Sequence, residues 1–273
     1  MSKVTVFEEA RAKINLTLEV SPVNQDGMHP ISSKMVTLDF CDDLELTQLD
    51  DHALSRYAVL WHEDAPKPTE IDWPITADLA VRAHRALEQS VGHVLPVQMK
   101  LVKRIPVGGG LGGGSADAGA MLRATVALFD LDIDCADIAL KLGSDVPFMF
   151  HGGACEVSGI GNKVVPVSYP ARHIVLAIPE YSCSTADVFR VFDSATHGIE
   201  TGPNELLGAA CSVHPRLKED MQTLSKVTGK GIHLSGSGST MFVICDNAEQ
   251  AAELAEKIRM QTTLVALATQ TSP

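Results

Sequence analysis

The chain contains short segments in which apolar and polar residues alternate. In residues 12–20, AKINLTLEV, apolar side chains occupy every second position, and Lys13 and Asn15 share the opposite side. A period of two is typical of a half-buried β-strand. The same pattern predicts strands in MVTLDF, LELTQL, RYAVLW and VQMKLVKRI, all in the amino-terminal half.

Other segments repeat their apolar residues at helical spacing. Residues 76–92 predict a helix that Thr76 or Asp78 can cap, with its apolar residues on one face. A second predicted helix follows a glycine-rich segment and begins at Ser115 or Ala116. Its apolar face indicates that it packs on a core.

The carboxy-terminal part predicts alternating strands and helices after a strand-rich stretch. Their order is that of a split β-α-β arrangement, in which helices separate a first strand from a hairpin-like pair and an edge strand closes the sheet. We therefore expect an α+β protein with two domains, residues 1–160 and 161–273. The predicted elements are strand 173–178, helices 185–192, 204–210 and 215–227, strands 231–235 and 240–245, helix 248–260 and edge strand 264–269.

Composition narrows the class of protein. Of the 273 residues, 45% are apolar, and the net charge of −12 argues against non-specific nucleic-acid binding, which needs a basic surface. No uncharged apolar run approaches the roughly 20 residues of a membrane helix. The six cysteines are scattered without a CxxC pair, which favours free thiols in a reducing compartment. We expect a cytoplasmic protein that binds neither nucleic acid nor membrane.

The candidate chemistry lies in RIPVGGGLGGGSADAGAML, which begins at Arg104 and has six glycines in the seven positions 108–114. A Walker loop is excluded because no lysine follows the glycines. A Rossmann fingerprint is matched in letters by Gly108, Gly110 and Gly113. So many glycines satisfy several patterns, however, and the preceding strand carries lysines where a buried parallel strand would be apolar.

A third interpretation is a long glycine loop around a triphosphate, with the amino end of the next helix directed at the charge. Free N–H groups and the positive end of the helix dipole favour an anion there. A flexible linker is the remaining alternative, and the strand before and helix after the glycines argue against it.

Four ordered segments resemble the GHMP kinase superfamily. PVGGGLGGGSADAGAM is similar to its central motif, and AKINLTLEV followed by DGMH resembles its amino-terminal motif. HLSGSGSTMF resembles the carboxy-terminal glycine motif, and LGSDVPFMFHGGACEVSGIG resembles the segment after the central helix. The resemblance runs from about Ala12 to Phe242. It implies a ribosomal-S5-like amino-terminal domain and a ferredoxin-like carboxy-terminal domain.

The resemblance also implies an activity: phosphoryl transfer from ATP, with Mg²⁺, to a small alcohol. The motifs are most similar to the branch that phosphorylates the 2-hydroxyl of 4-diphosphocytidyl-2-C-methyl-D-erythritol, a cytidine diphosphate-linked polyol of non-mevalonate isoprenoid synthesis. By position in the motifs, Lys13 and Asp145 are the implied catalytic residues, and Ser115 is the implied metal ligand. A monomer or homodimer is expected.

The other implied site residues fall into two groups. Those for ATP are Lys103, Pro106, Gly108, Gly109, Gly110, Gly112, Gly113, Gly114 and Ser115. Those for the acceptor are Asn15, Met28, His29, Phe189, Gly236 and Gly238.

The chain departs from the family's motifs at three positions. Ala116 replaces a common second serine, Asp78 replaces an asparagine near the adenine, and Met28 replaces a tyrosine that stacks on cytosine. A methionine sulfur can also contact a base face. Met28 and Asp78 keep open a kinase of the same superfamily with a different alcohol as substrate. An inactive nucleotide-binding regulator is the third hypothesis, and the presence of Lys13 and Asp145 argues against it.

Overall fold

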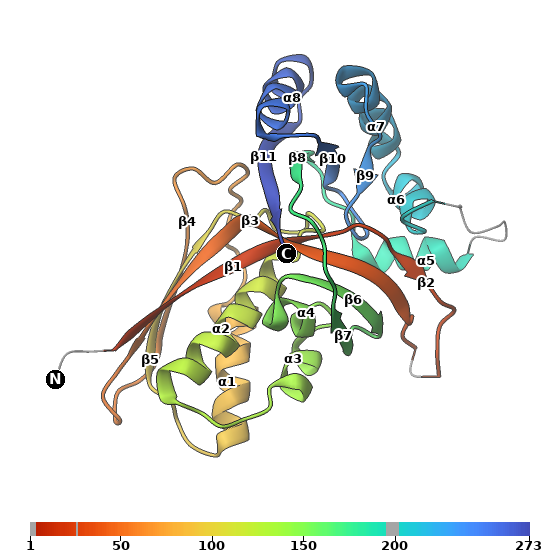
Figure 1. Ribbon diagram of the computed structural model, residues 1–273. Coiled ribbons are helices and arrows are strands. Elements are labelled where there is room, and N and C mark those ends of the chain that lie inside the picture. Colours follow the sequence, from red (N-terminus) through yellow and green to blue (C-terminus); the bar gives the residue numbers. More distant parts are fainter. Residues whose placement is uncertain (1–3, 26, 195–201) are drawn as a thin grey trace. The chain divides into compact units, whose positions relative to one another are not determined.

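Figure 1 shows the protein as a computed structural model, which describes residues 4–25, 27–194 and 202–273. The chain forms two compact units, each assembled from separate stretches. Unit 1 comprises residues 1–12, 40–107 and 112–152, and unit 2 comprises residues 13–39, 108–111 and 153–273. The division into contiguous domains at residue 160 stays a prediction.

The sheet of unit 1 is built on the second half of a long strand, β3 (Ile31–Gln48). β5 (Val97–Lys103) pairs antiparallel with β3, and β4 (Arg56–Trp61) pairs parallel with β5. β1 (Thr5–Asn15) also pairs with β3. In β5 buried residues alternate with more exposed ones, as its sequence predicts.

The helices of unit 1 lie together on one side of its sheet (Figure 1). Helix α2 begins at Gly113 and not at Ser115 or Ala116, because the left-handed Gly112 is its N-cap. Helix α2 is buried around most of its circumference, and even Asp117 is buried. The sequence pattern predicted only one buried face. The other helical elements are η1 (Ile75–Ala77), α1 (Leu79–Val91), α3 (Ala136–Leu142) and α4 (Val146–His151), and α2 ends at Phe129.

Unit 2 contains a four-stranded antiparallel sheet in the order β11-β8-β10-β9. These strands are β8 (His173–Ile178), β9 (His233–Leu234), β10 (Met241–Cys245) and β11 (Val265–Ser272). Counted along the chain from β8, the order is fourth, first, third and second. With helices after the first and third strands, this is the ferredoxin-like arrangement that the resemblance implies.

Three strand predictions need correction. MVTLDF and LELTQL form one continuous strand, β3. The strand predicted over residues 12–20 ends at Asn15, and β2 (Glu19–Val20) follows separately. β11 is not an edge strand, because it also pairs with β3 through Thr271 and Leu38. In each case pairing with a distant segment decides where a strand ends, and local alternation carries no such information.

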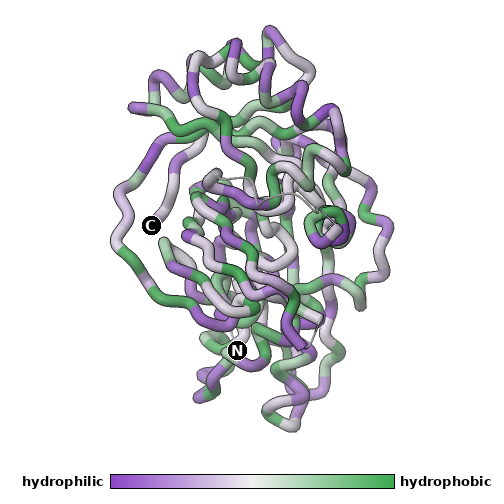
Figure 2. The backbone as a smooth tube through the Cα atoms, turned by 90° about the vertical axis from the view of Figure 1, so that its right-hand side faces the viewer, coloured by the Kyte–Doolittle hydropathy of each residue, from purple (hydrophilic) through white to green (hydrophobic). Residues whose placement is uncertain are grey.

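Helices α5 to α8 pack around a core to which β8 and β10 contribute the buried residues Val175, Ala177, Met241 and Val243, whereas β6 pairs with β3 and β7 pairs with β6. In helices α7 and α8, apolar residues recur among polar ones (Figure 2), as expected for helices with one buried side. These elements are β6 (Ala154–Gly159), β7 (Lys163–Pro166), α5 (Thr185–Ser194), α6 (Leu207–Val213), α7 (Pro215–Thr228) and α8 (Ala248–Gln261).

None of the six cysteines, all of which lie in the described part of the chain, forms a disulfide bond. Within the part of the chain that the structure describes, no helix has the length and apolar character needed to cross a membrane.

Candidate active site

In unit 2, Lys13 and Asn15 lie on the same side at the end of β1, as their spacing predicts. Both side chains are buried, and the Lys13 ammonium donates a hydrogen bond of 2.7 Å to Asn15 Oδ1. Asn15 Nδ2 donates to Ser33 Oγ at 2.8 Å, and Ser33 Oγ donates to the Thr17 carbonyl at 2.6 Å. This chain of hydrogen bonds fixes the amide of Asn15, which in turn orients the ammonium.

The two glycine motifs meet inside unit 2. Thr240 N donates to the Gly109 carbonyl at 3.0 Å, and Ser235 Oγ donates to the Gly110 carbonyl at 2.9 Å. A Cβ on Gly110 would lie 2.5 Å from the Ser235 carbonyl oxygen and 2.8 Å from the Gly238 carbonyl oxygen. The chain's own backbone therefore approaches Gly110 too closely for any side chain.

Gly236 joins these two groups of residues. A Cβ on Gly236 would lie 3.3 Å from Asn15 Oδ1 and 3.5 Å from Lys13 Nζ, with the Gly110 carbonyl oxygen at 3.8 Å. The structure thus brings together one predicted catalytic residue, two predicted acceptor residues and one predicted nucleotide-loop residue. They come from three motifs that are far apart in the sequence.

Asn204 belongs to the same region, although none of the sequence motifs contains it. Its buried amide donates to the carbonyls of Leu234 at 2.9 Å and Gly236 at 2.8 Å, while Oδ1 accepts from Leu206 N at 2.9 Å. The only local signal was a polar residue at the start of a predicted helix, which resembles an N-cap. Helix α6 begins later, with Leu206 as its N-cap.

The predicted acceptor residues His29 and Phe189 stack on each other, with ring centroids 5.0 Å apart and an interplanar angle of 29°. The His29 ring nitrogens also lie 2.9 Å from the Ser21 carbonyl oxygen and 3.2 Å from an Asp193 carboxylate oxygen. A base on Phe189 must therefore use the other ring face or displace His29. Met28 is 44% exposed. Asp26, the first residue of the DGMH motif, lies outside the described residues.

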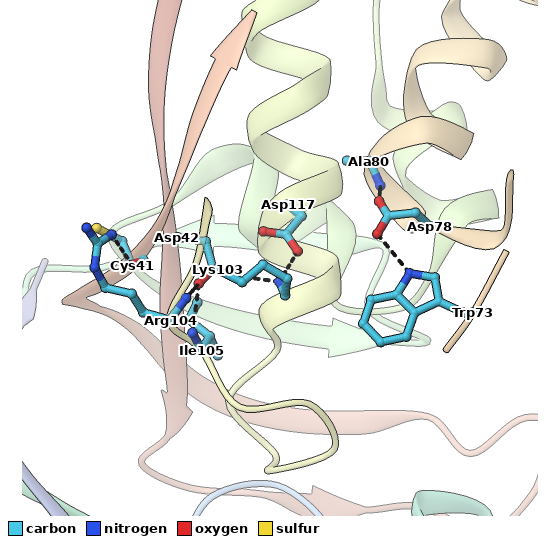
Figure 3. A network of polar contacts seen from close by, with 9 residues as sticks. All are labelled: Cys41, Asp42, Trp73, Asp78, Ala80, Lys103, Arg104, Ile105 and Asp117. Atoms are coloured by element: carbon cyan, nitrogen blue, oxygen red, sulfur yellow. Dashed lines mark hydrogen bonds and ion pairs between the residues drawn. The ribbon is translucent and has the colours of Figure 1, made fainter. Parts of the chain in front are cut away.

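In unit 1, Lys103 lies at the end of β5 in a buried cluster with two carboxylates (Figure 3). Its ammonium donates to Asp42 Oδ2 at 2.6 Å and to Asp117 Oδ2. Burial lowers the pKa of Lys103, but the two carboxylates outweigh it, and the pKa lies above its ordinary value. Burial raises the pKa of Asp117 well above its ordinary value, and Lys103 opposes only part of that shift. The Lys103 ammonium is thus engaged by the protein itself.

The predicted ATP-binding residues after Lys103 form a bend and the start of α2. Pro106 is buried, whereas Gly108 is exposed and left-handed with a φ of 73°. Gly113 packs against Ile105, since a Cβ would lie 2.9 Å from Ile105 Cγ2. Gly114 follows as the second residue of α2, and its Cβ would lie 3.2 Å from Leu79 Cδ1.

Ser115 is the third residue of α2 and is partly exposed. Ser115 does not cap α2, because Gly112 occupies the N-cap position. Among residues 4–25, 27–194 and 202–273, no three histidine, cysteine or acidic side chains are grouped as a metal site. Mg²⁺ is often held by few protein ligands together with substrate phosphates. Ser115 fits the role of one such ligand.

Asp145 and Asp78 both lie at helix N-caps but differ in what their carboxylates do. Asp145 precedes α4, and its side chain makes no capping hydrogen bond. Asp78 caps α1 by accepting from Ala80 N at 2.9 Å, and its other oxygen accepts from Trp73 Nε1 at 3.2 Å (Figure 3). The Asp78 carboxylate therefore stabilises the start of α1, whereas the Asp145 carboxylate does not cap α4.

Comparison with known proteins identifies the family. The chain matches the model of the GHMP kinases N-terminal domain over residues 78–153 and that of the GHMP kinases C-terminal domain over residues 205–261. It is 34% identical to a protein of Polaromonas naphthalenivorans named 4-diphosphocytidyl-2-C-methyl-D-erythritol kinase, over 89% of this chain and 87% of that protein. It is 32% identical to a protein of the same name from Exiguobacterium sibiricum, over 94% of each chain.

Solved structures agree with the sequence relatives. The fold is similar to a crystal structure of 4-(cytidine 5'-diphospho)-2C-methyl-D-erythritol kinase, with a TM-score of 0.79 and 27% identity over 98% of this chain and 100% of that one. It also shares its fold with a homoserine kinase from Cytophaga hutchinsonii, with a TM-score of 0.66 over 98% of this chain and 94% of that one, at 15% identity. From its motifs, its topology and these relatives, the chain belongs to the GHMP kinase family.

Proposed function

We propose that this protein is an ATP-dependent kinase that phosphorylates the 2-hydroxyl of 4-diphosphocytidyl-2-C-methyl-D-erythritol. The observation that carries the proposal is the meeting of Lys13, Asn15, Gly110 and Gly236 in unit 2. It places an ammonium and an amide beside two glycine backbones, which suits the binding of a hydroxyl and a phosphoryl group. The names and coverage of the relatives support the choice of acceptor.

The proposed chemistry is an in-line transfer to an alcohol. The acceptor oxygen attacks the γ-phosphorus, its proton passes to the Asp145 carboxylate, and the bond to the β-phosphate oxygen breaks to release ADP. The Lys13 ammonium offsets the negative charge that develops on the transferred group. The glycine loop and Ser115 contact the phosphates, and Mg²⁺ held there would neutralise part of their charge.

A competing hypothesis concerns which alcohol the protein phosphorylates. The contact between His29 and Phe189 supports one acceptor site that contains both residues. Met28, next to His29 in the chain, is a methionine where the family has an aromatic ring. A different alcohol is the alternative because of Met28 and Asp78. A cytoplasmic location and a monomer or homodimer are part of the proposal, and six cysteines without a disulfide bond support a reducing compartment.

The test is an assay of ADP formation with ATP, Mg²⁺ and the cytidine substrate, beside the same acceptor without its cytidine. We expect turnover only with the cytidine compound. Asp145→Asn should lower kcat by about 100-fold or more, because the proton acceptor is lost. Its binding of a non-hydrolysable ATP analogue should stay near that of the parent.

The control is Asp132→Asn, a change of an exposed carboxylate in the same unit, which should leave turnover unchanged. Equal turnover of an acceptor without cytidine would overturn the substrate and leave the kinase. Turnover of Asp145→Asn within a few-fold of the parent would remove Asp145 from the mechanism.

A further inference from the structure

The buried cluster of Lys103, Asp42 and Asp117 connects three elements of unit 1. Asp42 lies on β3, Lys103 is the last residue of β5, and Asp117 lies in the second turn of α2. None of the three side chains is more than 4% exposed. Asp42 and Asp117 carry no role in the proposed chemistry, so their burial calls for another explanation.

Asp42 holds the chain where it enters the glycine segment. Its Oδ1 accepts from Arg104 N and, at 2.7 Å, from Ile105 N, the two amides that follow the end of β5 (Figure 3). Its Oδ2 accepts from the Lys103 ammonium at 2.6 Å. One carboxylate thus fixes the direction in which three consecutive residues leave the sheet.

Asp117 holds the chain where it leaves the glycine segment. Its Oδ2 accepts from the same ammonium, which ties the beginning of α2 to the end of β5. The two ends also touch directly, because Gly113 packs against the Ile105 side chain with no room for a Cβ. Residues 106–112 therefore form a loop whose two ends are joined through one lysine.

The cluster is not explained by its contribution to stability. Buried ion pairs pay a large desolvation cost, and well-packed apolar residues often replace them without loss. Within the described residues, Asp117 Oδ1 is also buried without a hydrogen-bond partner, which is a further cost. What an ion pair supplies, and an apolar contact does not, is a fixed separation and direction between the groups it joins.

We propose that Asp42 and Asp117 are positioning residues that act through Lys103 to hold the two ends of the glycine loop in the geometry that binds nucleotide phosphates. The role of the loop in this statement rests on the proposed function. Lys103 acts from within the cluster, with its ammonium on the two carboxylates and not on the nucleotide. A loop so rich in glycine has many accessible conformations, so its order depends on the contacts that hold it. Thr240 and Ser235 hold its middle through the carbonyls of Gly109 and Gly110, and the cluster holds its ends.

The first measurement needs no ligand. Hydrogen–deuterium exchange of residues 104–114 should be at least several-fold faster in Asp117→Asn than in the parent, because the amide has the same shape but forms no ion pair. The matched control is Leu128→Ala, which removes buried apolar atoms near the other end of α2. It should lower the melting temperature without faster exchange in residues 104–114.

The second measurement is the affinity for a non-hydrolysable ATP analogue with Mg²⁺. We expect a loss of about tenfold or more in Asp117→Asn, with KM for the acceptor unchanged and no such loss in Leu128→Ala. If Lys103 instead contacted the nucleotide, freeing its ammonium from Asp117 would leave or improve that affinity. Unchanged exchange and unchanged affinity in Asp117→Asn would each overturn the proposal.

A double variant, Lys103→Met with Asp117→Leu, covers the case in which Asp117→Asn fails to fold. It replaces the ion pair with apolar side chains and leaves Asp42 on its two backbone amides. We expect a folded protein with a loose loop and weak nucleotide binding, and parent-like binding would overturn the proposal. If the wild-type protein failed to phosphorylate the acceptor, the proposed function would fall while the exchange result still decided the role of the cluster.

Discussion

At Gly110, the absence of a side chain is required by the protein's own backbone. The sequence suggested that the space was needed for phosphate oxygens. The structure shows the carbonyls of Ser235 and Gly238 in that space, from the second glycine motif. Loss of nucleotide binding in a Gly110→Val variant would therefore not by itself show that the loop contacts phosphate, since such a side chain collides with the protein first.

Gly110→Ala should lower the free energy of unfolding more than Gly229→Ala, its matched control. Both glycines lie in unit 2 with positive φ, +76° and +68°, and only Gly229 has nothing within 4 Å of an added Cβ. The backbone strain alone should cost Gly229→Ala about 1–2 kcal/mol. Overpacking should add about 1–3 kcal/mol at Gly110. Urea denaturation measures both, and equal losses would contradict the contact with the second motif.

At the scale of elements, Asn204 links three parts of unit 2: Leu18, the end of β9 and the second glycine motif. Asn204 forms a parallel bridge with Leu18, and its amide bonds the carbonyls at the end of β9 and at Gly236. Gly236 lies beside Lys13 and Asn15. The hydrogen bond from Asn204 to the Gly236 carbonyl therefore connects Asn204 to the candidate site. Asn204 is therefore a positioning residue for the second glycine motif.

Asn204→Ala should lower both stability and activity. The change leaves two buried carbonyls without their donor, which should cost about 1–3 kcal/mol in the free energy of unfolding. It should lower kcat about tenfold or more, because Gly236 is free to shift beside Lys13.

The control is Asn247→Ala, which removes the side-chain cap of α8. It should cost about 1 kcal/mol and leave kcat unchanged. If Asn204→Ala reduced stability but kept full kcat, Asn204 would be a purely structural residue. Urea denaturation and steady-state kinetics separate these outcomes.

At the scale of the whole molecule, His84 makes stability depend on pH. It is fully buried on α1, and its Nε2 lies 2.8 Å from the Leu95 carbonyl oxygen, so this nitrogen is the donor. Nδ1 then accepts from the Tyr57 hydroxyl at 2.9 Å, which satisfies a neutral ring. Burial lowers the pKa of His84, and Glu88 at 4.0 Å opposes this only in part.

The free energy of unfolding should fall as the pH is lowered below about 6.5. Between the ordinary pKa of histidine and the lowered pKa of His84, the unfolded chain binds a proton that the folded protein does not. The stability from neutral His84 is thus present above 6.5 and lost below it, at up to about 1.4 kcal/mol per pH unit. Burial also lowers the pKa of His233, which adds to the slope.

Urea denaturation between pH 7.5 and 5.5 measures this slope. His84→Gln, whose amide can still donate to Leu95, should reduce it. An unchanged slope in that variant would show that His84 does not contribute.

Much of the candidate site could be predicted from the sequence because its residues lie in motifs with local signatures. Lys13 and Asn15 are two residues apart on a strand and therefore share one side of it, and the structure places both beside Gly236. The task of Lys103 could not be predicted in this way. Its partners Asp42 and Asp117 come from other elements, and one of them lies on a helix that looked simply amphipathic. Roles at Asp145 and Ser115 stay predictions.

The sequence alone determined the class of the fold and most of its elements. The alternation in β5, the continuous apolar run in β8 and the helical period in α1 and α8 are local properties, which a strand or helix carries wherever it packs. Only the tertiary structure decided that β3 is one long strand, that β11 lies inside its sheet, and that Gly110 meets Ser235. These features depend on hydrogen bonds and contacts between segments distant in the chain, and a pattern read along one segment contains no information about its partner.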